Sequence, residues 1–187
     1  TGDTETAKAP SDTGYGEVSA CLNRMIHAVE CELPYDYNAL EAVPPPEVKA
    51  TLRDYQLKGL RWLVGTYCNG INAILGDEMG LGKTLQTITY LTWLKVTAGV
   101  TGPYLVVVPL SVLSAWLAEF KRFSPSMRVV RLHSGDKNER ERLRREELAD
   151  VANFDVVLTT YEMVKSPNIR RSLTSRIHWR YVVLDEG

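Results

Sequence analysis

A glycine-rich octapeptide, Asp-Glu-Met-Gly-Leu-Gly-Lys-Thr, has the residue types that a phosphate-binding loop needs. Gly80 and Gly82 let the backbone turn its N–H groups toward a polyphosphate. The Lys83 ammonium can reach the β- and γ-phosphates, and the Thr84 hydroxyl can ligate Mg²⁺. The alternative is a tight turn with an exposed lysine. The candidate residues for binding ATP in this loop are Asp77, Glu78, Met79, Gly80, Leu81, Gly82, Lys83 and Thr84.

A pair of carboxylates, Asp185 and Glu186, follows the apolar run 181–184. A carboxylate at the tip of a buried strand suits a magnesium site, so we expect Asp185 to bind Mg²⁺ together with Thr84. Glu186 can orient and polarise an attacking water. Such pairs also occupy solvated turns, and the phosphate loop upstream is what favours the chemical interpretation. The predicted catalytic residues are therefore Lys83, Asp185 and Glu186.

A glutamine, Gln56, is the candidate for reading the base. Its side-chain amide can donate to and accept from the adenine edge at once, which would select ATP over GTP. It lies in the stretch Leu-Arg-Asp-Tyr-Gln, shortly before the first predicted strand. The alternative is a solvent-facing glutamine on an amphipathic helix.

The elements that must position these residues alternate between short apolar runs and helices. Thr51 and Asp54 have the spacing of a capping box that starts a helix, and Asn69-Gly70 is a plausible stop. Asp136 and Glu139 are predicted to cap a later, charged helix. Runs of this kind predict an α/β fold, a parallel sheet with helices on both faces. The predicted strands are 71–75, 104–108, 129–132, 154–159 and 181–184, and further helices are expected at 83–96 and after Ser111.

Residues 1–50 differ in character from the rest. We expect a largely disordered or extended linker, with a possible short helix at 18–32 and a break at the three prolines 44–46. Residues 51–187 form the predicted globular domain. Because the chain starts with Thr1 and stops directly after an Asp-Glu pair, we expect it to be a fragment whose domain is incomplete.

Composition excludes several classes of protein. The net charge of −1 argues against a globally basic nucleic-acid binder, so contact with DNA must come from a local patch. The three cysteines are widely spaced and contain no CxxC pair, which argues against a disulfide framework or a zinc site. No apolar run is long enough for a membrane helix, and an intracellular protein without a membrane partner is expected.

Taken together, these motifs resemble those of the Swi/Snf-type ATPases of helicase superfamily two. The resemblance rests on Leu-Arg-x-Tyr-Gln, on the octapeptide, whose Asp77 is usual in that family, and on Asp-Glu-Gly at the end. The stretch 107–111, with Trp116, resembles the family's motif Ia, and the stretch 158–162 resembles its motif Ib. The stretches 119–123 and 134–137 are similar to the imitation-switch and lymphoid-specific-helicase branches.

The resemblance implies the first RecA-like lobe of a nuclear motor that uses ATP and Mg²⁺, tracks double-stranded DNA and remodels nucleosomes. The second lobe, with the family's arginine finger, would lie outside this chain, so the isolated chain should be nearly inactive. The residues that the resemblance turns toward a DNA strand are Pro109, Ser111, Thr159 and Thr160.

Three other functions stay open at this stage. One is a recombination or repair translocase of the same family, and another is a nucleotide-switched scaffold without turnover. RNA unwinding is less favoured, because the acidic motif is Asp-Glu-Gly and not the Asp-Glu-Ala-Asp of RNA helicases.

The stretch 121–145 has nine Lys and Arg against three Asp and Glu. It is either a second DNA patch or a solvated helix in which Glu141 pairs with Arg145 and Arg142 with Glu146. Trp93 and Trp116 are predicted to pack into the lobe, because their helices have apolar stripes.

Overall fold

A parallel sheet of four strands forms the centre of the computed structural model, which describes residues 42–186. The order across the sheet is β2-β3-β1-β4, so β1 lies between β3 and β4. Residue Val107 of β1 is in register with Thr159 on one side and Leu184 on the other. The strands are β1 Tyr104–Val108, β2 Val129–Leu132, β3 Val156–Thr160 and β4 Tyr181–Leu184.

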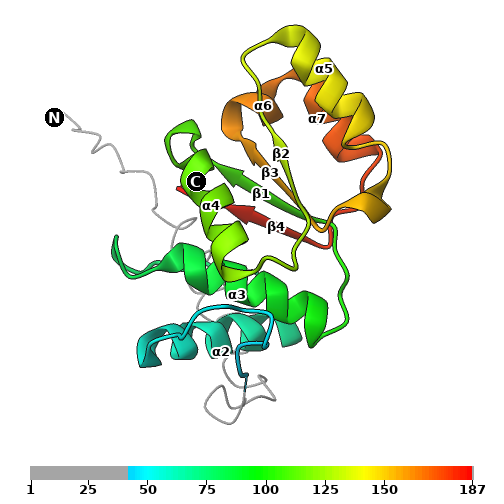
Figure 1. Cartoon of the computed structure of the whole chain (residues 1–187). Helices are drawn as coiled ribbons and strands as arrows, with labels where there is room; N and C mark the ends of the chain where they lie inside the picture. Colours follow the sequence, from blue (N-terminus) through cyan, green and yellow to red (C-terminus); the bar gives the residue numbers. More distant parts are fainter. Residues whose placement is uncertain (1–41, 187) are drawn as a thin grey trace, which may run out of the picture. The chain divides into compact units, whose positions relative to one another are not determined.

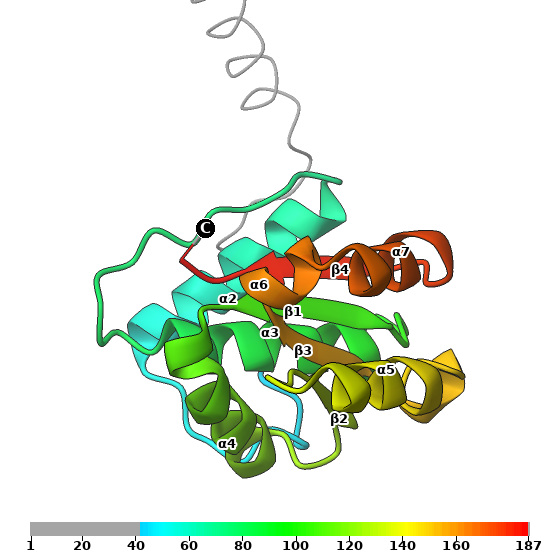
Figure 2. The same ribbon diagram turned by 90° about the horizontal axis from the view of Figure 1, so that it is seen from above.

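Helices cover both faces of this sheet, as the sequence predicts (Figures 1 and 2). Successive side chains of β1 point to opposite faces, since a strand has a period of two. Val106 and Val108 are fully buried in one apolar cluster with α2, α3 and α4. Leu105 and Val107 belong to a second cluster, which includes residues of α6 and α7. All five residues of β1 are buried, which explains why the strand is a continuous apolar run.

Helix α2, Asp54–Cys68, packs beside α3 and begins later than the predicted capping box implies. Its N-cap is Arg53, whose backbone N–H donates to Gln56 Oε1 at 2.9 Å. The box prediction on Thr51 and Asp54 is therefore wrong, because the reciprocal side chain belongs to Gln56. The predicted stop is confirmed, since Asn69 is the C-cap and Gly70 has a φ of +69°.

The other helices follow local capping signals. Helix α3 spans Lys83–Val96, as predicted. A 3₁₀ turn, Leu110–Val112, leads into α4, Leu113–Phe123. Helix α5, Lys137–Glu146, has the predicted cap, in which the Asp136 carboxylate accepts from the Glu139 backbone N–H at 2.8 Å. The short helices α6, Tyr161–Lys165, and α7, Pro167–Ser175, were not among the predicted elements.

The run 71–75 is not a strand, and this prediction is wrong. The segment between α2 and α3 is irregular chain outside the sheet, and Ile74 is 90% exposed (Figure 2). A strand exists only through a hydrogen-bonded neighbour, and among residues 42–186 no strand pairs with this run. Among residues 42–186, β4 is an edge strand that pairs only with β1. Its side chains Val182 and Leu184 are exposed.

Part of the expected linker is packed. Ala42 and Val48 are buried in the first apolar cluster, and the Lys49 backbone N–H donates to the Phe123 carbonyl at 2.7 Å. The packed unit therefore includes residues before Thr51, whereas the possible helix at 18–32 lies outside the described residues. Between residues 42 and 186, no helix has both the length and the apolar character needed to cross a bilayer.

A buried carboxylate, Asp155, ties three elements together at the amino-terminal edge of the sheet. It is 1% exposed and accepts from Lys95 Nζ at 2.7 Å and from two nitrogens of the Arg128 side chain at 2.9 and 3.2 Å. Burial alone would raise the pKa of Asp155, but the hydrogen bonds from Arg128 and Lys95 outweigh it and lower the pKa. The contact fixes the C-terminal end of α3 at this edge.

Candidate nucleotide-binding site

The predicted phosphate loop joins the irregular segment after α2 to the first turn of α3. Gly80 and Gly82 have φ values of +86° and +76°, in the left-handed region that favours glycine. Gly82 is also the N-cap of α3 and provides no side-chain cap, so the first N–H groups of the helix keep their capacity to bind an anion. The Lys83 ammonium folds back onto its own loop, where it donates to the carbonyls of Asp77 at 2.6 Å and Glu78 at 3.1 Å.

Two buried glutamines hold the two limbs of the loop, the entry limb at Asp77 and the exit limb at Leu81. Gln56 of α2 donates from Nε2 to the Leu81 carbonyl at 3.1 Å. Gln86 of α3 donates from Nε2 to Asp77 Oδ2 at 3.0 Å. Gln56 is 6% exposed and Gln86 is fully buried, so the interpretation of Gln56 as a solvent-facing residue is wrong. Because an amide has two donors and two lone pairs, Gln56 keeps one of each for a ligand.

The remaining loop residues are more open. Glu78, Met79 and Gly80 are exposed, and Met79 is 89% exposed, whereas Thr84 is half-buried at the start of α3. An exposed thioether at the crest of the loop has no packing role among the described residues. The crest is therefore free to meet a ligand, while the limbs are fixed by the glutamines.

Asp185 lies directly after β4 and has three hydrogen bonds of its own. Its Oδ2 accepts from the Trp116 indole N–H at 2.8 Å, and its backbone carbonyl accepts from the Tyr161 hydroxyl at 2.8 Å. Its backbone N–H donates to the Val107 carbonyl of the neighbouring strand at 2.9 Å. One carboxylate oxygen is thus oriented by the indole, and Oδ1 has no protein partner among residues 42–186.

The direction of α3 brings the phosphate loop to the edge of the sheet at which Asp185 lies. Lys95, in the last turn of α3, is bonded to Asp155 just before β3 begins, so α3 ends at the amino-terminal edge. Its first residue, Lys83, lies about 18 Å from Lys95 along the helix axis at 1.5 Å per residue, toward the opposite edge. Figure 1 shows the start of α3 at the end to which the arrowheads of β1 and β4 point. No hydrogen bond or ion pair joins Lys83 to Asp185 in this structure.

Glu186 is exposed and has a φ of +51°, which is uncommon for a residue with a side chain. The pKa of the neighbouring Tyr161 hydroxyl is raised, first by burial and then by the negative charges of Asp185 and Glu186. Tyr161 therefore stays protonated and remains a donor to the Asp185 carbonyl.

Sequence reasoning missed three supporting residues: Gln86, the indole N–H of Trp116, and Tyr161. The prediction that Trp116 packs into the lobe is confirmed, since it is 4% exposed, and Trp93 also packs against the first cluster. The available signal was that a buried indole usually has a hydrogen-bond acceptor.

The four residues expected to face DNA differ in exposure. Ser111 is exposed and Pro109 is half-buried, at the end of β1. Thr159 is fully buried, and its hydroxyl donates to the Leu132 carbonyl at 2.8 Å. Thr160 is also fully buried, and its Oγ1 accepts from the Met163 backbone N–H as the N-cap of α6. In this conformation both threonine hydroxyls are hydrogen-bonded inside the protein, and their contact with DNA stays a prediction.

Three arginines of the basic stretch 121–145 pair with glutamates of helix α5. Arg142 bridges Glu139 and Glu146, and Glu141 is shared by Arg144 and Arg145. The predicted pairs 141–145 and 142–146 are thus confirmed, which favours the solvated helix over a second DNA patch.

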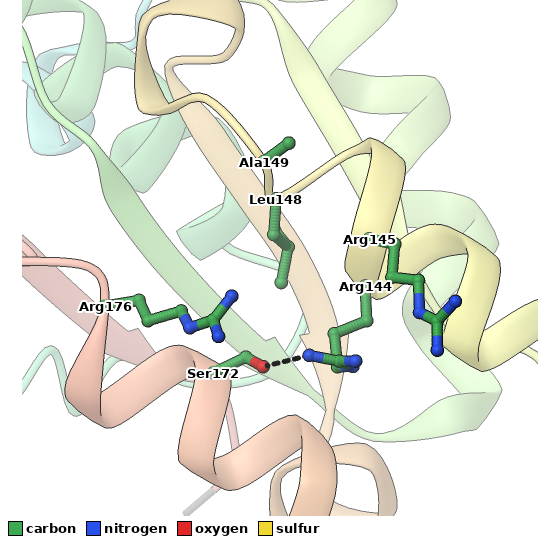
Figure 3. A pocket seen from close by; sticks show the side chains of 6 residues that line it. All are labelled: Arg144, Arg145, Leu148, Ala149, Ser172 and Arg176. Atoms are coloured by element: carbon green, nitrogen blue, oxygen red, sulfur yellow. Dashed lines mark hydrogen bonds between the residues drawn. The ribbon is translucent and has the colours of Figure 1, made fainter.

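An arginine-lined cavity of about 290 Å³ lies between α5 and α7, on the face of the sheet opposite α3 (Figure 3). Arg144 donates to the Ser172 hydroxyl at 3.4 Å and also pairs with Glu141. Its charge is therefore partly neutralised inside the protein, and the cavity is separate from the phosphate loop.

Comparison with known proteins gives one consistent group of relatives. Residues 55–187 match the family described as the SNF2-related domain. The chain is 49% identical over 146 residues to the human SWI/SNF-related matrix-associated actin-dependent regulator of chromatin subfamily A member 1, which covers 78% of this chain. It is 47% identical over 138 residues, 73% of the chain, to the ATP-dependent DNA helicase DDM1 of Arabidopsis thaliana.

A solved structure agrees with these sequences. The SWI2/SNF2 ATPase core of Sulfolobus solfataricus, in complex with double-stranded DNA, has a TM-score of 0.64 and 34% identity over 79% of this chain. The chain spans 14% of the human relative's length, 18% of the Arabidopsis relative's length and 28% of the archaeal chain.

Proposed function

Because this chain belongs to the SNF2-related family, we propose that it supplies the ATP-binding lobe of a motor that translocates along double-stranded DNA and remodels nucleosomes. The observation that carries the proposal is the common edge of the sheet at which the phosphate loop and Asp185 lie. A lysine at the start of a helix, here Lys83 of α3, and an aspartate directly after a strand, here Asp185 after β4, are the two halves of a nucleoside-triphosphate site.

The residues present fit ATP with Mg²⁺. The left-handed glycines turn the loop, the start of α3 has N–H groups without a side-chain cap, and Oδ1 of Asp185 keeps its lone pairs. Thr84 and Asp185 would hold Mg²⁺, and Gln56 would contact the adenine edge with its remaining donor and acceptor. Bound Mg²⁺ supplies positive charge that neutralises the β- and γ-phosphates.

The chain's own residues have distinct parts in hydrolysis. Lys83 would exchange its two loop carbonyls for phosphate oxygens, because a charged acceptor forms the stronger hydrogen bond. Glu186 would orient the attacking water and accept its proton. A second lobe would contribute an arginine, which is worth about 10³–10⁵ in rate, so this lobe alone should hydrolyse almost no ATP.

The relatives favour duplex DNA and the nucleosome as substrates, and the nucleus as the place of action. The human relative is described as a regulator of chromatin, and the archaeal core was solved with double-stranded DNA. Of the residues expected to face DNA, Ser111 is the exposed one with a side-chain donor, whereas Pro109 has no backbone N–H and its carbonyl accepts from the Val112 N–H at 3.1 Å. Contacts to phosphates from such groups position a duplex without reading its sequence.

The test uses the full-length protein, in which Lys83→Ala and Glu186→Gln are compared with the unaltered protein. We expect Lys83→Ala to lose ATP binding, and Glu186→Gln to bind ATP but hydrolyse it at least about a hundredfold more slowly. DNA-stimulated hydrolysis and displacement of a third strand from duplex DNA are the measurements. A Glu186→Gln protein with normal DNA-dependent activity would indicate a nucleotide-switched scaffold and would refute the proposal.

The choice between chromatin and repair substrates needs a second measurement. A chromatin remodeller should move a histone octamer along a positioned DNA fragment in an ATP-dependent reaction. A repair translocase of the same family should track naked duplex DNA and leave the octamer in place.

A further inference from the structure

Gln86 is a buried amide in direct contact with the phosphate loop, and the proposed steps of ATP binding and hydrolysis give it no part. It lies three residues after Lys83, so the two side chains leave α3 on the same side, one turn apart. Gln86 is fully buried, although a polar amide is costly to bury unless its hydrogen bonds serve a purpose. The one hydrogen bond of its side chain among the described residues is the donation from Nε2 to Asp77 Oδ2 at 3.0 Å.

The other end of this amide has no hydrogen-bond donor. Oε1 of Gln86 is buried without a hydrogen-bond partner among residues 42–186. A carboxylate can only accept, so the amide must turn its NH₂ group toward Asp77, and Oε1 is left facing α2. A Cβ added at Gly59 of α2 would lie 2.0 Å from Oε1, so a larger residue there would force the Gln86 side chain to move. The Gly59 Cα–H can give the oxygen no more than a weak contact.

We propose that Gln86 is a positioning residue that fixes Asp77, and with it the entry limb of the phosphate loop, in the geometry that accepts ATP. Asp77 is held at both ends, because its carboxylate meets Gln86 and its carbonyl meets Lys83. When the Lys83 ammonium turns to phosphate, the contact with Gln86 is the one that remains. The amide thus donates to Asp77 while its buried oxygen Oε1 accepts no hydrogen bond. The inference rests on the proposed function, since it concerns the same nucleotide.

The geometry also explains why α2 approaches α3 so closely at this point. Gly59 lies one turn after Gln56, and Gln56 holds the exit limb at Leu81. A Cβ at Gly82 would lie 2.5 Å from Gln56 Nε2. Each limb is therefore held by one glutamine, and each glutamine lies against a glycine. Gln86 at the entry limb lies against Gly59, and Gln56 at the exit limb lies against Gly82.

The experiment exploits the polarity of the hydrogen bond in the full-length protein. Gln86→Glu places two carboxylates face to face, and we expect the KM for ATP to rise at least about tenfold. Asp77→Asn keeps an acceptor for Nε2 but alters the loop itself, so its own KM is measured as the baseline for the double variant. In the double variant, the amide introduced at position 77 can donate to the carboxylate introduced at position 86, so the hydrogen bond returns with reversed polarity. KM of the double variant should then lie within about threefold of that of Asp77→Asn alone, although Gln86→Glu by itself raises KM.

Gln86→Leu separates positioning from simple packing. It is close to the amide in size and removes the unpartnered oxygen, so the melting temperature without nucleotide should stay the same or rise. The KM for ATP should nevertheless rise about tenfold, because Asp77 loses its donor. Binding of a fluorescent ADP analogue provides a second readout of the same site.

Two outcomes would overturn the inference: an unchanged KM in Gln86→Leu and Gln86→Glu, or a double variant that is worse than Gln86→Glu alone. Both require that the unaltered protein hydrolyses ATP. If the unaltered protein does not hydrolyse ATP, it is the proposed function that fails, and the two failures are distinguishable.

Discussion

The indole of Trp116 offers the sharpest test of how Asp185 is oriented. Trp116→Phe keeps an aromatic ring in the core but removes the N–H that donates to Oδ2 at 2.8 Å. A hydrogen bond to a charged acceptor contributes about 1.5–3 kcal/mol. Asp185 is half-buried, so water can replace part of this donation, and the lower end applies. A value of about 1.4 kcal/mol corresponds to a tenfold change in affinity, within the range found when the outer partner of a metal ligand is removed.

The measurement is DNA-stimulated ATP hydrolysis by the full-length protein as a function of Mg²⁺ concentration. Trp116→Phe should need about tenfold more Mg²⁺ for half-maximal rate, because its Asp185 carboxylate is free to rotate. Trp93→Phe is the matched control, since Trp93 packs against the same cluster and has no side-chain hydrogen bond among the described residues. Equal Mg²⁺ requirements in the two variants would refute the reasoning, whatever their stabilities.

Three further predictions concern the packing around the loop. Gly59→Ala should lower the free energy of unfolding by about 1–3 kcal/mol, because the new Cβ meets Gln86. Chemical denaturation measures the change. Gly135→Ala is the control and should be neutral, because its Cβ meets open space. The lowered pKa of Asp155 means that its stabilisation is present above its ordinary pKa and is lost as pH falls through the lowered value. Thermal melts of Asp155→Asn should therefore show a lower melting temperature at neutral pH and a smaller further loss than the unaltered protein as the pH falls below the ordinary aspartate pKa. Gln56→Glu loses the donor to the loop carbonyl and to the base, so competition assays should show a weaker preference for ATP over GTP.

Much of the fold could be predicted because its signals are local. The limits of α3, β1, β2 and β4 agree with the runs read from the sequence, and the Asp136 cap is a contact between residues three apart. Burial on both faces makes each central strand a continuous apolar run, which is easy to recognise. The run 71–75 has the same composition, but a strand also needs a neighbour, and composition does not report one.

The supports of the site could not be predicted, because they join distant segments. Trp116 and Asp185 are 69 residues apart, and Gln56 and Leu81 are 25 apart. Their contact depends on the strand order, which places β1 beside β4, and on the packing of α2 against α3. A tryptophan and a glutamine are also ordinary core and surface residues, so their types alone do not indicate a contact with Asp185 or with the loop backbone.

The two groups of residues should respond differently to substitution. Lys83 and Glu186 would contact the phosphates or the water directly, so their substitution removes the group that binds or reacts. Gln86 and Trp116 act through a carboxylate that remains in place, so the carboxylate keeps its charge and loses only its orientation. Substitution of Lys83 or Glu186 should therefore abolish turnover. Substitution of Gln86 or Trp116 should instead raise the concentration of ATP or Mg²⁺ that turnover requires.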